Sequence, residues 1–316
     1  YEGFGNTMNG FGDPSMMGGF GDNTAGQQQN GMSNGLGSGS MGGDLDKIQT
    51  TGKYAIEVWK SCGMDLKNVE FVWASEFYKK NPDYWKTVMQ LAMSSTVTRV
   101  LRCSQIMGRE EGKKSKSSQI MYPLMQAADI IHLEADIAQL GLDQRKVNML
   151  ARDIFPKIGK PKPIAIHHHM LLGLQFNQSE LEGVDRKIAM KMSKSKPDTA
   201  IFMTDTEPVV EKKFRKAHCV DGVIEDNPVL EYAKYIIFEL MNEIKIERPE
   251  KYGGNLSFKS YEELEKAFSS GKLKSIDLKT GVAAAINKLL EPTREHFSKG
   301  SPKKLLEKVQ SFEVTR

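Results

Sequence analysis

Cysteine is scarce in this sequence, with only Cys62, Cys103 and Cys219 among 316 residues. An odd number of cysteines at wide spacing argues against a disulfide scaffold and a CxxC zinc site, so a reducing cytosol is the simplest compartment. No run of about 18 uncharged apolar residues occurs, which argues against a transmembrane helix. Residues 1–43 have neither a basic start nor an apolar stretch, so we expect no secretory signal within them.

Basic residues are missing from residues 1–43, which contain no Lys or Arg, three acids and 14 of the 28 glycines. Such a segment cannot bury enough apolar surface to offset its ordering entropy, so we predict that it is disordered. It is either a neutral tail, a gene-model artefact, or a weak self-association segment based on its Phe, Tyr and Gln side chains. Residues 44–316 carry a net charge of +7 and suit one large domain or two smaller ones.

Helix and strand patterns alternate from Asp44 onward. Apolar spacing predicts helices at 44–62, 83–93, 118–129 and 143–155. Short β-branched or aromatic runs predict strands at 69–75, 130–135 and 163–169, and residues 108–118 read as an exposed loop. This alternation is typical of a parallel α/β sheet, which we assign to a domain at 44–205. After residue 205 the sequence shows helical periodicity without strand patterns, which predicts an α-helical domain at 206–316.

The most informative polar cluster is Tyr122-x3-Gln126-x2-Asp129. Spacings of four and seven residues place the three side chains on one helical face. A phenol, an amide and an acid within an apolar helix are costly to bury unless something binds them, which indicates a small, partly polar ligand. A hydrogen-bonded structural trio is the alternative.

Two further polar groups follow predicted strands. Asp136 and the run Asp143-Gln144-Arg145-Lys146 come after a predicted strand, and the run opens a helix. Ligands of open α/β sheets bind at the carboxyl ends of the strands, and helix N-termini suit anions. For Asp143, a helix N-cap is the structural alternative.

A third motif is Lys191-Met192-Ser193-Lys194-Ser195. Two lysines among small hydroxyl residues suit a cationic loop that closes over a triphosphate and stabilises charge on departing pyrophosphate. A solvated charged surface is the alternative. Adjacent His167, His168 and His169 do not indicate a metal site, because neighbouring side chains on a strand point to opposite faces.

KMSKS is the signature loop of class I aminoacyl-tRNA synthetases. The segments YPLMQAADI and LGLDQRKVNMLARD, with KMSKSKPDTAIFMTD and EKYGGN, resemble the tyrosyl-tRNA synthetases of archaeal and eukaryotic type, especially the plant and protist cytosolic form. The resemblance extends from Met41 to Arg316. It implies a Rossmann-like catalytic domain at 44–205, an α-helical anticodon-binding domain at 206–316, and a cytoplasmic homodimer. The implied partners are L-tyrosine, ATP with Mg²⁺, and tRNA(Tyr), with no DNA or membrane partner.

The resemblance also implies a role for each motif. Asp129 would accept the hydroxyl proton of substrate tyrosine, and such a site rejects phenylalanine, a rule of which tyrosyl-tRNA synthetases are themselves the known example. Tyr122, Gln126 and Gln144 would hold the substrate α-amino group. Lys191 and Lys194 would be catalytic, and the whole loop, with Met192, Ser193 and Ser195, would bind ATP.

Two residues of the predicted second domain match the anticodon site of this family. Tyr252 would stack on the first anticodon base, and Asp277 would hydrogen-bond it, which is how proteins read unpaired RNA bases. The alternatives are a structural aromatic and a helix N-cap. Lys274-Ser275 stands where the family commonly has His-Pro, and Lys274 would still meet a phosphate.

Class I synthetases also have a HIGH-type motif, and no such string occurs here; the first histidine is His132. The resemblance places this motif, the first strands and a second tyrosine-binding tyrosine before Met41. Three hypotheses follow: a synthetase whose N-terminal part is absent from the sequence, a catalytically silent short form that binds tRNA or tyrosine, or a chain that needs another subunit. The retained Asp129 and KMSKS loop favour the first. For the chain as given we expect little tyrosine-dependent ATP–pyrophosphate exchange.

Overall fold

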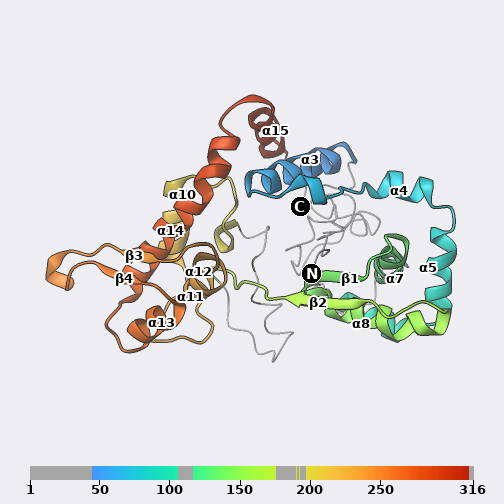
Figure 1. Cartoon of the computed structure of the whole chain (residues 1–316), viewed down its shortest axis with the longest axis horizontal. Coiled ribbons are helices and arrows are strands. Elements are labelled where there is room, and N and C mark those ends of the chain that lie inside the picture. Colours follow the sequence, from blue (N-terminus) through green and yellow to red (C-terminus); the bar gives the residue numbers. More distant parts are fainter. Residues whose placement is uncertain (1–44, 106–116, 176–189, 191, 193–196, 313–316) are drawn as a thin grey trace. The chain divides into compact units, whose positions relative to one another are not determined.

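The computed structural model describes residues 45–105, 117–175, 190, 192 and 197–312 (Figure 1). The chain divides into two compact units: residues up to 170 together with those from 300 onward, and residues 171–299. The predicted disorder of residues 1–43 and most of the predicted loop at 108–118 lie outside the described residues. Within the described part, no helix is long and apolar enough to span a membrane.

The first unit combines helices with a parallel pair of strands. β1 (Ile137–Gly141) and β2 (Ile164–His168) pair in parallel, and α8 (Arg145–Ile154) lies between them in the chain. This β1–α8–β2 crossover confirms the predicted α/β class and the predicted strand at 163–169. The other helices of this unit are α3 (Leu45–Ser61), α4 (Ala74–Lys80), α5 (Tyr84–Met93), α6 (Val97–Gln105), α7 (Ser117–His132) and α15 (Gly300–Gln310).

The core of the first unit forms where α5, α6 and α8 pack against α7. From α5 come Tyr84, Val88 and Leu91, which are completely buried. Their spacing of three to four residues is the apolar stripe that predicted this helix. The core thereby fixes α7, the helix with the polar cluster, between α5 on one side and α8 on another.

The predicted strand at 69–75 is wrong. Phe71 stacks on Trp59 of α3, with ring centroids 5.7 Å apart, and α4 begins at Ala74. The amides of Glu76 and Phe77 donate to the Trp73 carbonyl, so the chain is already turning into a helix there. β-Branched and aromatic residues suit any half-buried surface, and here the run forms a single β-bridge at Phe71 instead of a strand.

The predicted strand at 130–135 is also wrong, because α7 continues through it to His132. The Leu133 amide donates to the Asp129 carbonyl at 2.8 Å, a helical hydrogen bond. The strand comes later, as β1. A short apolar run fits a buried helix end as well as a strand, so its sequence alone does not separate the two.

The second unit is mostly helical, as predicted, but it contains a short antiparallel pair, β3 (Ile244–Ile246) and β4 (Leu256–Phe258). Residues 228–244, which belong to the run with predicted helical periodicity, do not form one continuous helix. They consist of α11 (Pro228–Tyr232), a π-helical turn (Ala233–Ile237) and α12 (Phe238–Leu240), and the chain then enters β3. The remaining helices are α10 (Glu207–Lys216), α13 (Tyr261–Ser269) and α14 (Ser275–His296).

A glycine explains how α14 approaches the strand pair so closely. A Cβ atom at Gly281 would lie 2.6 Å from Cγ1 of Ile246 in β3, so a side chain here would clash with a core residue. Ile246 and Val282 are completely buried, and both belong to the apolar core of this unit. Helix α14 therefore packs directly on β3, a contact that helical periodicity alone does not reveal.

The second unit begins earlier than the predicted border at residues 205 and 206. The Leu174 amide donates to the Thr199 carbonyl at 2.9 Å, and the His218 amide donates to the Leu174 carbonyl at 2.7 Å. The Leu172 amide donates to a carboxylate oxygen of Glu231 in α11 at 2.7 Å. These bonds join the described residues of the segment after β2 to the helices of the second unit.

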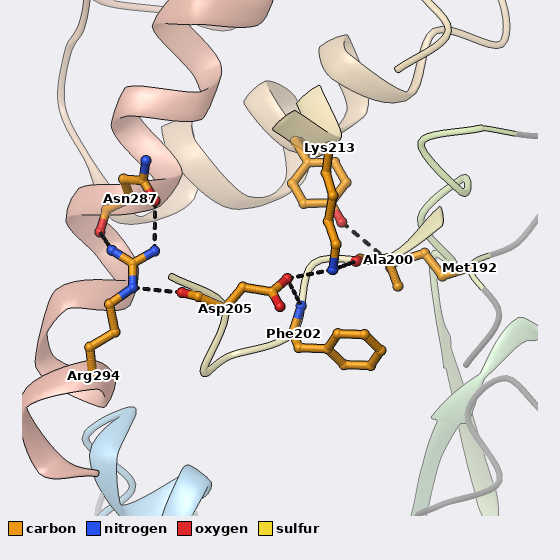
Figure 2. A network of polar contacts seen from close by, with 8 residues as sticks. Met192, Ala200, Phe202, Asp205, Lys213, Asn287 and Arg294 are labelled. Atoms are coloured by element: carbon orange, nitrogen blue, oxygen red, sulfur yellow. Dashed lines mark hydrogen bonds and ion pairs between the residues drawn. The ribbon is translucent and has the colours of Figure 1, made fainter. Parts of the chain in front are cut away.

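A buried polar network fixes residues 200–205 within the second unit, as Figure 2 shows. Lys213 of α10 donates from Nζ to Asp205 Oδ2 at 2.6 Å and to the Ala200 carbonyl at 2.8 Å. The Phe202 amide donates to the same Asp205 oxygen at 2.9 Å. Arg294 of α14 donates from Nε to the Asp205 carbonyl at 2.7 Å. One short segment is thus attached to two helices.

Candidate functional site

Helix α7 places the predicted cluster on one face, next to the start of α8. Gln126 and Asp129 are buried at 7% exposure each, and Tyr122 is half-buried. Gln126 Nε2 donates to Gln144 Oε1 at 3.2 Å, so the two predicted amide side chains are in contact. Gln126 Oε1 is buried with no hydrogen-bond partner among the described residues. A buried amide oxygen of this kind suits a ligand that supplies an N–H donor.

Gln144 reaches this position because of where β1 ends. A 3-10 turn (Leu142–Gln144) follows β1 directly, and α8 begins at Arg145. The prediction that residues 143–146 follow a strand and open a helix is therefore confirmed. Asp136 differs: it precedes β1, and its carbonyl accepts from the Ile164 amide at 2.9 Å. It lies at the opposite end of the strand because β1 starts after the run that was predicted to be the strand.

Asp129 has a partner that the sequence did not identify. Tyr84, the first residue of α5, donates from its hydroxyl to Asp129 Oδ1 at 2.7 Å, and the same hydroxyl lies 3.0 Å from the Met125 carbonyl. Tyr84 appeared in the sequence only as part of an apolar stripe. Its hydroxyl group was the feature that could have indicated a role beyond packing, because a completely buried tyrosine usually finds a hydrogen-bond partner.

Burial decides the electrostatics of this pair. It raises the pKa of Asp129 to about 7, while the hydrogen bond from Tyr84 acts in the opposite direction. Burial also raises the pKa of the Tyr84 phenol, as does the nearby Asp129 carboxylate. Tyr84 is therefore a neutral donor, and Asp129 changes its charge near neutral pH.

The histidines of β2 point in alternating directions, as the strand geometry requires. His167 is half-buried, and its Nε2 lies 3.1 Å from Nδ2 of Asn148 in α8, whereas His168 is exposed. Burial lowers the pKa of His167. Among the described residues, no group of three or more His, Cys, Asp or Glu side chains is placed to hold a metal ion.

Most of the KMSKS loop lies outside the described residues. That applies to Lys191, Ser193, Lys194 and Ser195. Met192 is described, and the Tyr232 hydroxyl of α11 lies 3.4 Å from its sulfur. Met192, the second residue of the loop, packs against the core of the second unit.

The two predicted anticodon residues lie in the second unit. Tyr252 is 62% exposed on a 3-10 turn (Glu250–Tyr252), with Lys251 Nζ 4.9 Å from its ring centroid. Asp277 lies in the first turn of α14, but Lys274 occupies the N-cap position, so Asp277 is not the N-cap.

Arg248, which the sequence analysis did not single out, contacts both Asp277 and the loop that follows Tyr252. It lies 3.7 Å from an Asp277 oxygen and donates from Nε to the Gly254 carbonyl at 3.0 Å, two residues after Tyr252. The loop that follows Tyr252 and the Asp277 carboxylate thus share Arg248 as a partner. An exposed ring and an adjacent acid are suited to stacking on an unpaired base and hydrogen-bonding to its edge.

The β1–α8–β2 crossover, with buried polar side chains gathered at the end of β1, is the ligand-binding arrangement of an open α/β sheet, and in this chain the sheet is that of a class I tRNA synthetase. Residues 36–291 match the family described as tRNA synthetases class I (W and Y). Tryptophanyl-tRNA synthetase from Aeropyrum pernix, at 19% identity and a TM-score of 0.56, shares the fold.

Curated relatives narrow the assignment. Tyrosine–tRNA ligase 1, cytoplasmic, from Arabidopsis thaliana is 48% identical over 279 residues, which is 87% of this chain and 70% of that protein. Tyrosine–tRNA ligase from Sulfurisphaera tokodaii is 47% identical over 281 residues, 87% of this chain and 77% of that protein. Tyrosyl-tRNA synthetase from Pyrococcus horikoshii, solved with L-tyrosine, matches 85% of this chain and 78% of its own at 39% identity and a TM-score of 0.76. The chain belongs to the tyrosyl-tRNA synthetases of archaeal and eukaryotic type.

Proposed function

We propose that this protein is a tyrosine–tRNA ligase, which activates L-tyrosine with ATP and transfers it to tRNA(Tyr). The observation that carries this proposal is the buried Asp129 carboxyl group on the same face of α7 as the unpartnered Gln126 amide oxygen. An acceptor for a phenol and an acceptor for an ammonium group, on one face, match the two ends of tyrosine. The relatives from Arabidopsis and Sulfurisphaera are named tyrosine–tRNA ligases.

The tyrosine would lie along α7. Its hydroxyl would donate to Asp129, and its α-amino group to Gln126 Oε1, with Tyr122 and Gln144 completing that end. The helix rises about 1.5 Å per residue, so the seven residues from Tyr122 to Asp129 extend about 10 Å. Asp129 and Gln126 are almost excluded from water, which strengthens each hydrogen bond to the substrate.

ATP and the KMSKS loop would supply the chemistry. A carboxylate oxygen of tyrosine forms a bond to the α-phosphorus, and the bond from that phosphorus to the bridging oxygen breaks, so that pyrophosphate leaves with the electron pair. Lys191 and Lys194 would stabilise its charge, and Mg²⁺ would accompany ATP, since this ion is commonly held by substrate phosphates. A ribose hydroxyl of the tRNA then attacks the activated carbonyl, and AMP leaves. Positioning and charge stabilisation suffice for both steps.

A titration with L-tyrosine and L-phenylalanine tests this proposal. We expect calorimetry to show saturable binding of tyrosine and binding at least about tenfold weaker for phenylalanine, because a buried acid left without its donor is costly. The two ligands differ in one hydroxyl group, so each is the control for the other. Equal affinities would reject tyrosine selection by Asp129.

The second unit would read the anticodon through Tyr252 and Asp277. Substituting Tyr252 by alanine is expected to weaken binding of tRNA(Tyr) about 5- to 100-fold, because stacking on a base contributes about 1–3 kcal/mol. Tyr235→Ala is the matched control, since Tyr235 is also exposed, at 41%, and lies in the same unit. Filter binding measures both variants. A similar loss in the two would point to general charge or surface effects instead of base stacking.

We also propose a cytoplasmic homodimer. The outer face of α5 exposes Trp85, Met89 and Met93, at 49%, 54% and 84%, and Val97 at the start of α6 is 60% exposed. The first three are spaced four residues apart, so they form one apolar stripe, a feature typical of protein contact surfaces. The Arabidopsis relative is named as cytoplasmic. Sedimentation velocity measures the association state directly.

A further inference from the structure

The hydroxyl group of Tyr84 is held in place by rings on several sides. Its ring centroid lies 4.4 Å from that of Tyr78, 5.6 Å from that of Trp85 and 5.3 Å from that of His132. The side chain is completely buried at 0% exposure. A residue packed in this way has little freedom to turn, so its hydroxyl points steadily toward Asp129.

The hydrogen bond divides the two oxygens of Asp129 between two tasks. Among the described residues, Tyr84 hydrogen-bonds this carboxyl group, and it donates to Oδ1 at 2.7 Å. A phenol has one proton, and its other partners, the Met125 carbonyl and the Tyr78 hydroxyl, are neutral, so the ionised Asp129 carboxylate is the strongest acceptor for it. Oδ2 remains available to accept from a second donor.

We propose that Tyr84 is a positioning residue for tyrosine selection, which orients Asp129 and stabilises its ionised form so that Oδ2 faces the substrate hydroxyl. This inference rests on the proposed function. A phenol that donates to a carboxylate favours the charged form, and the charged form is the stronger acceptor. Selection of tyrosine therefore depends on two helices: α7 supplies the acceptor, and α5 supplies the group that aims it.

The test is Tyr84→Phe, which removes the hydroxyl and retains the ring. We expect the dissociation constant for L-tyrosine to rise about tenfold, as for loss of a hydrogen bond to a charged group. The constant for L-phenylalanine, which has no hydroxyl, is expected to change less than about twofold on the same grounds. Tyr261→Phe, in the second unit, is the matched control and should change neither. A residue with a merely structural role would weaken both ligands alike, and that result, or an unchanged tyrosine constant, would overturn the proposal.

A double variant covers the case in which Tyr84→Phe does not fold because Asp129 is left buried without a donor. Tyr84→Phe combined with Asp129→Asn contains no buried carboxylate. If Tyr84 acts through Asp129, the double variant should select tyrosine at least as well as Asp129→Asn does, because no hydroxyl then holds the amide oxygen away from the substrate. A further loss of tyrosine selection would contradict this. The two hypotheses remain separable. A wild-type protein that does not distinguish tyrosine from phenylalanine rejects the proposed function, whereas discrimination that survives Tyr84→Phe rejects only the positioning role.

Discussion

Replacing Asp129 by asparagine is expected to abolish most of the preference for tyrosine and, at pH 8, to make the first unit more stable. Tyr84 can donate only to the amide oxygen of the new side chain, so the amide nitrogen takes the place of Oδ2. A donor then faces the substrate hydroxyl instead of a charged acceptor. We expect tyrosine affinity to fall about 10- to 100-fold, the range for a hydrogen bond to a charged group.

The gain in stability follows from the raised pKa of Asp129. Burial brings this pKa from 3.8 to about 7 in the folded protein, so the folded state binds the proton more tightly than the unfolded state does. Stability is therefore lost as the pH rises from about 4 to above 7, when the buried group must ionise. Asparagine removes this cost, and we expect a gain on the order of 4 kcal/mol at pH 8 and little change near pH 4, given about 1.4 kcal/mol per pKa unit.

Urea denaturation followed by tryptophan fluorescence measures this effect, because Trp59, Trp73 and Trp85 all lie in the first unit. Asp153→Asn is the control, since Asp153 is an acid of α8 with a 62% exposed side chain, paired with Arg99 on the surface. It should leave both stability and ligand preference unchanged. An Asp129→Asn protein that is equally or less stable at pH 8 would contradict the assignment of a buried, costly carboxylate.

Removal of the Lys213 side chain is expected to produce the largest loss of stability in the second unit. Lys213 and Asp205 form an ion pair at 2.6 Å, with side chains only 6% and 13% exposed. In Lys213→Ala, the Asp205 carboxylate keeps the Phe202 amide as a donor but loses its countercharge, and the Ala200 carbonyl loses its donor. Breaking a buried pair in this way costs about 3–5 kcal/mol.

Helix α10 also supplies the matched control. Lys216 pairs with Asp198 at 3.5 Å, but these side chains are 51% and 59% exposed. We expect Lys216→Ala to cost at most about 1 kcal/mol, because water screens the pair. Hydrogen exchange of the α10 and α14 amides measures the second unit by itself. Equal protection in both lysine variants would show that burial of the Lys213 pair does not matter to stability.

The sequence was most informative where chemistry lies within one helix. The spacing of Tyr122, Gln126 and Asp129 predicted a shared face, and α7 presents them so, because the helical repeat is a local property. The sequence also predicted correctly that Gln144 follows a strand and lies at the start of a helix. Both predictions depend on neighbours within a few residues, which the chain specifies directly.

Contacts between distant segments could not be predicted in the same way. Tyr84 and Asp129 are separated by 45 residues, and their hydrogen bond at 2.7 Å exists only because α5 packs on α7. Likewise, Arg248 meets Asp277 because the segment that follows β3 lies near the start of α14. Neither pair leaves a periodic signal in the sequence.

From the sequence alone came the family, the helices with strong apolar stripes, and the shared helix of Tyr122, Gln126 and Asp129. Only the tertiary structure showed that the apolar run after Asp129 ends a helix, that β3 and β4 pair inside a mostly helical unit, and that Tyr84 hydrogen-bonds Asp129. The physical reason is the range of the forces involved. Backbone periodicity is set by neighbouring residues, whereas strand pairing, burial and the pKa of a buried acid depend on what the rest of the fold brings beside them.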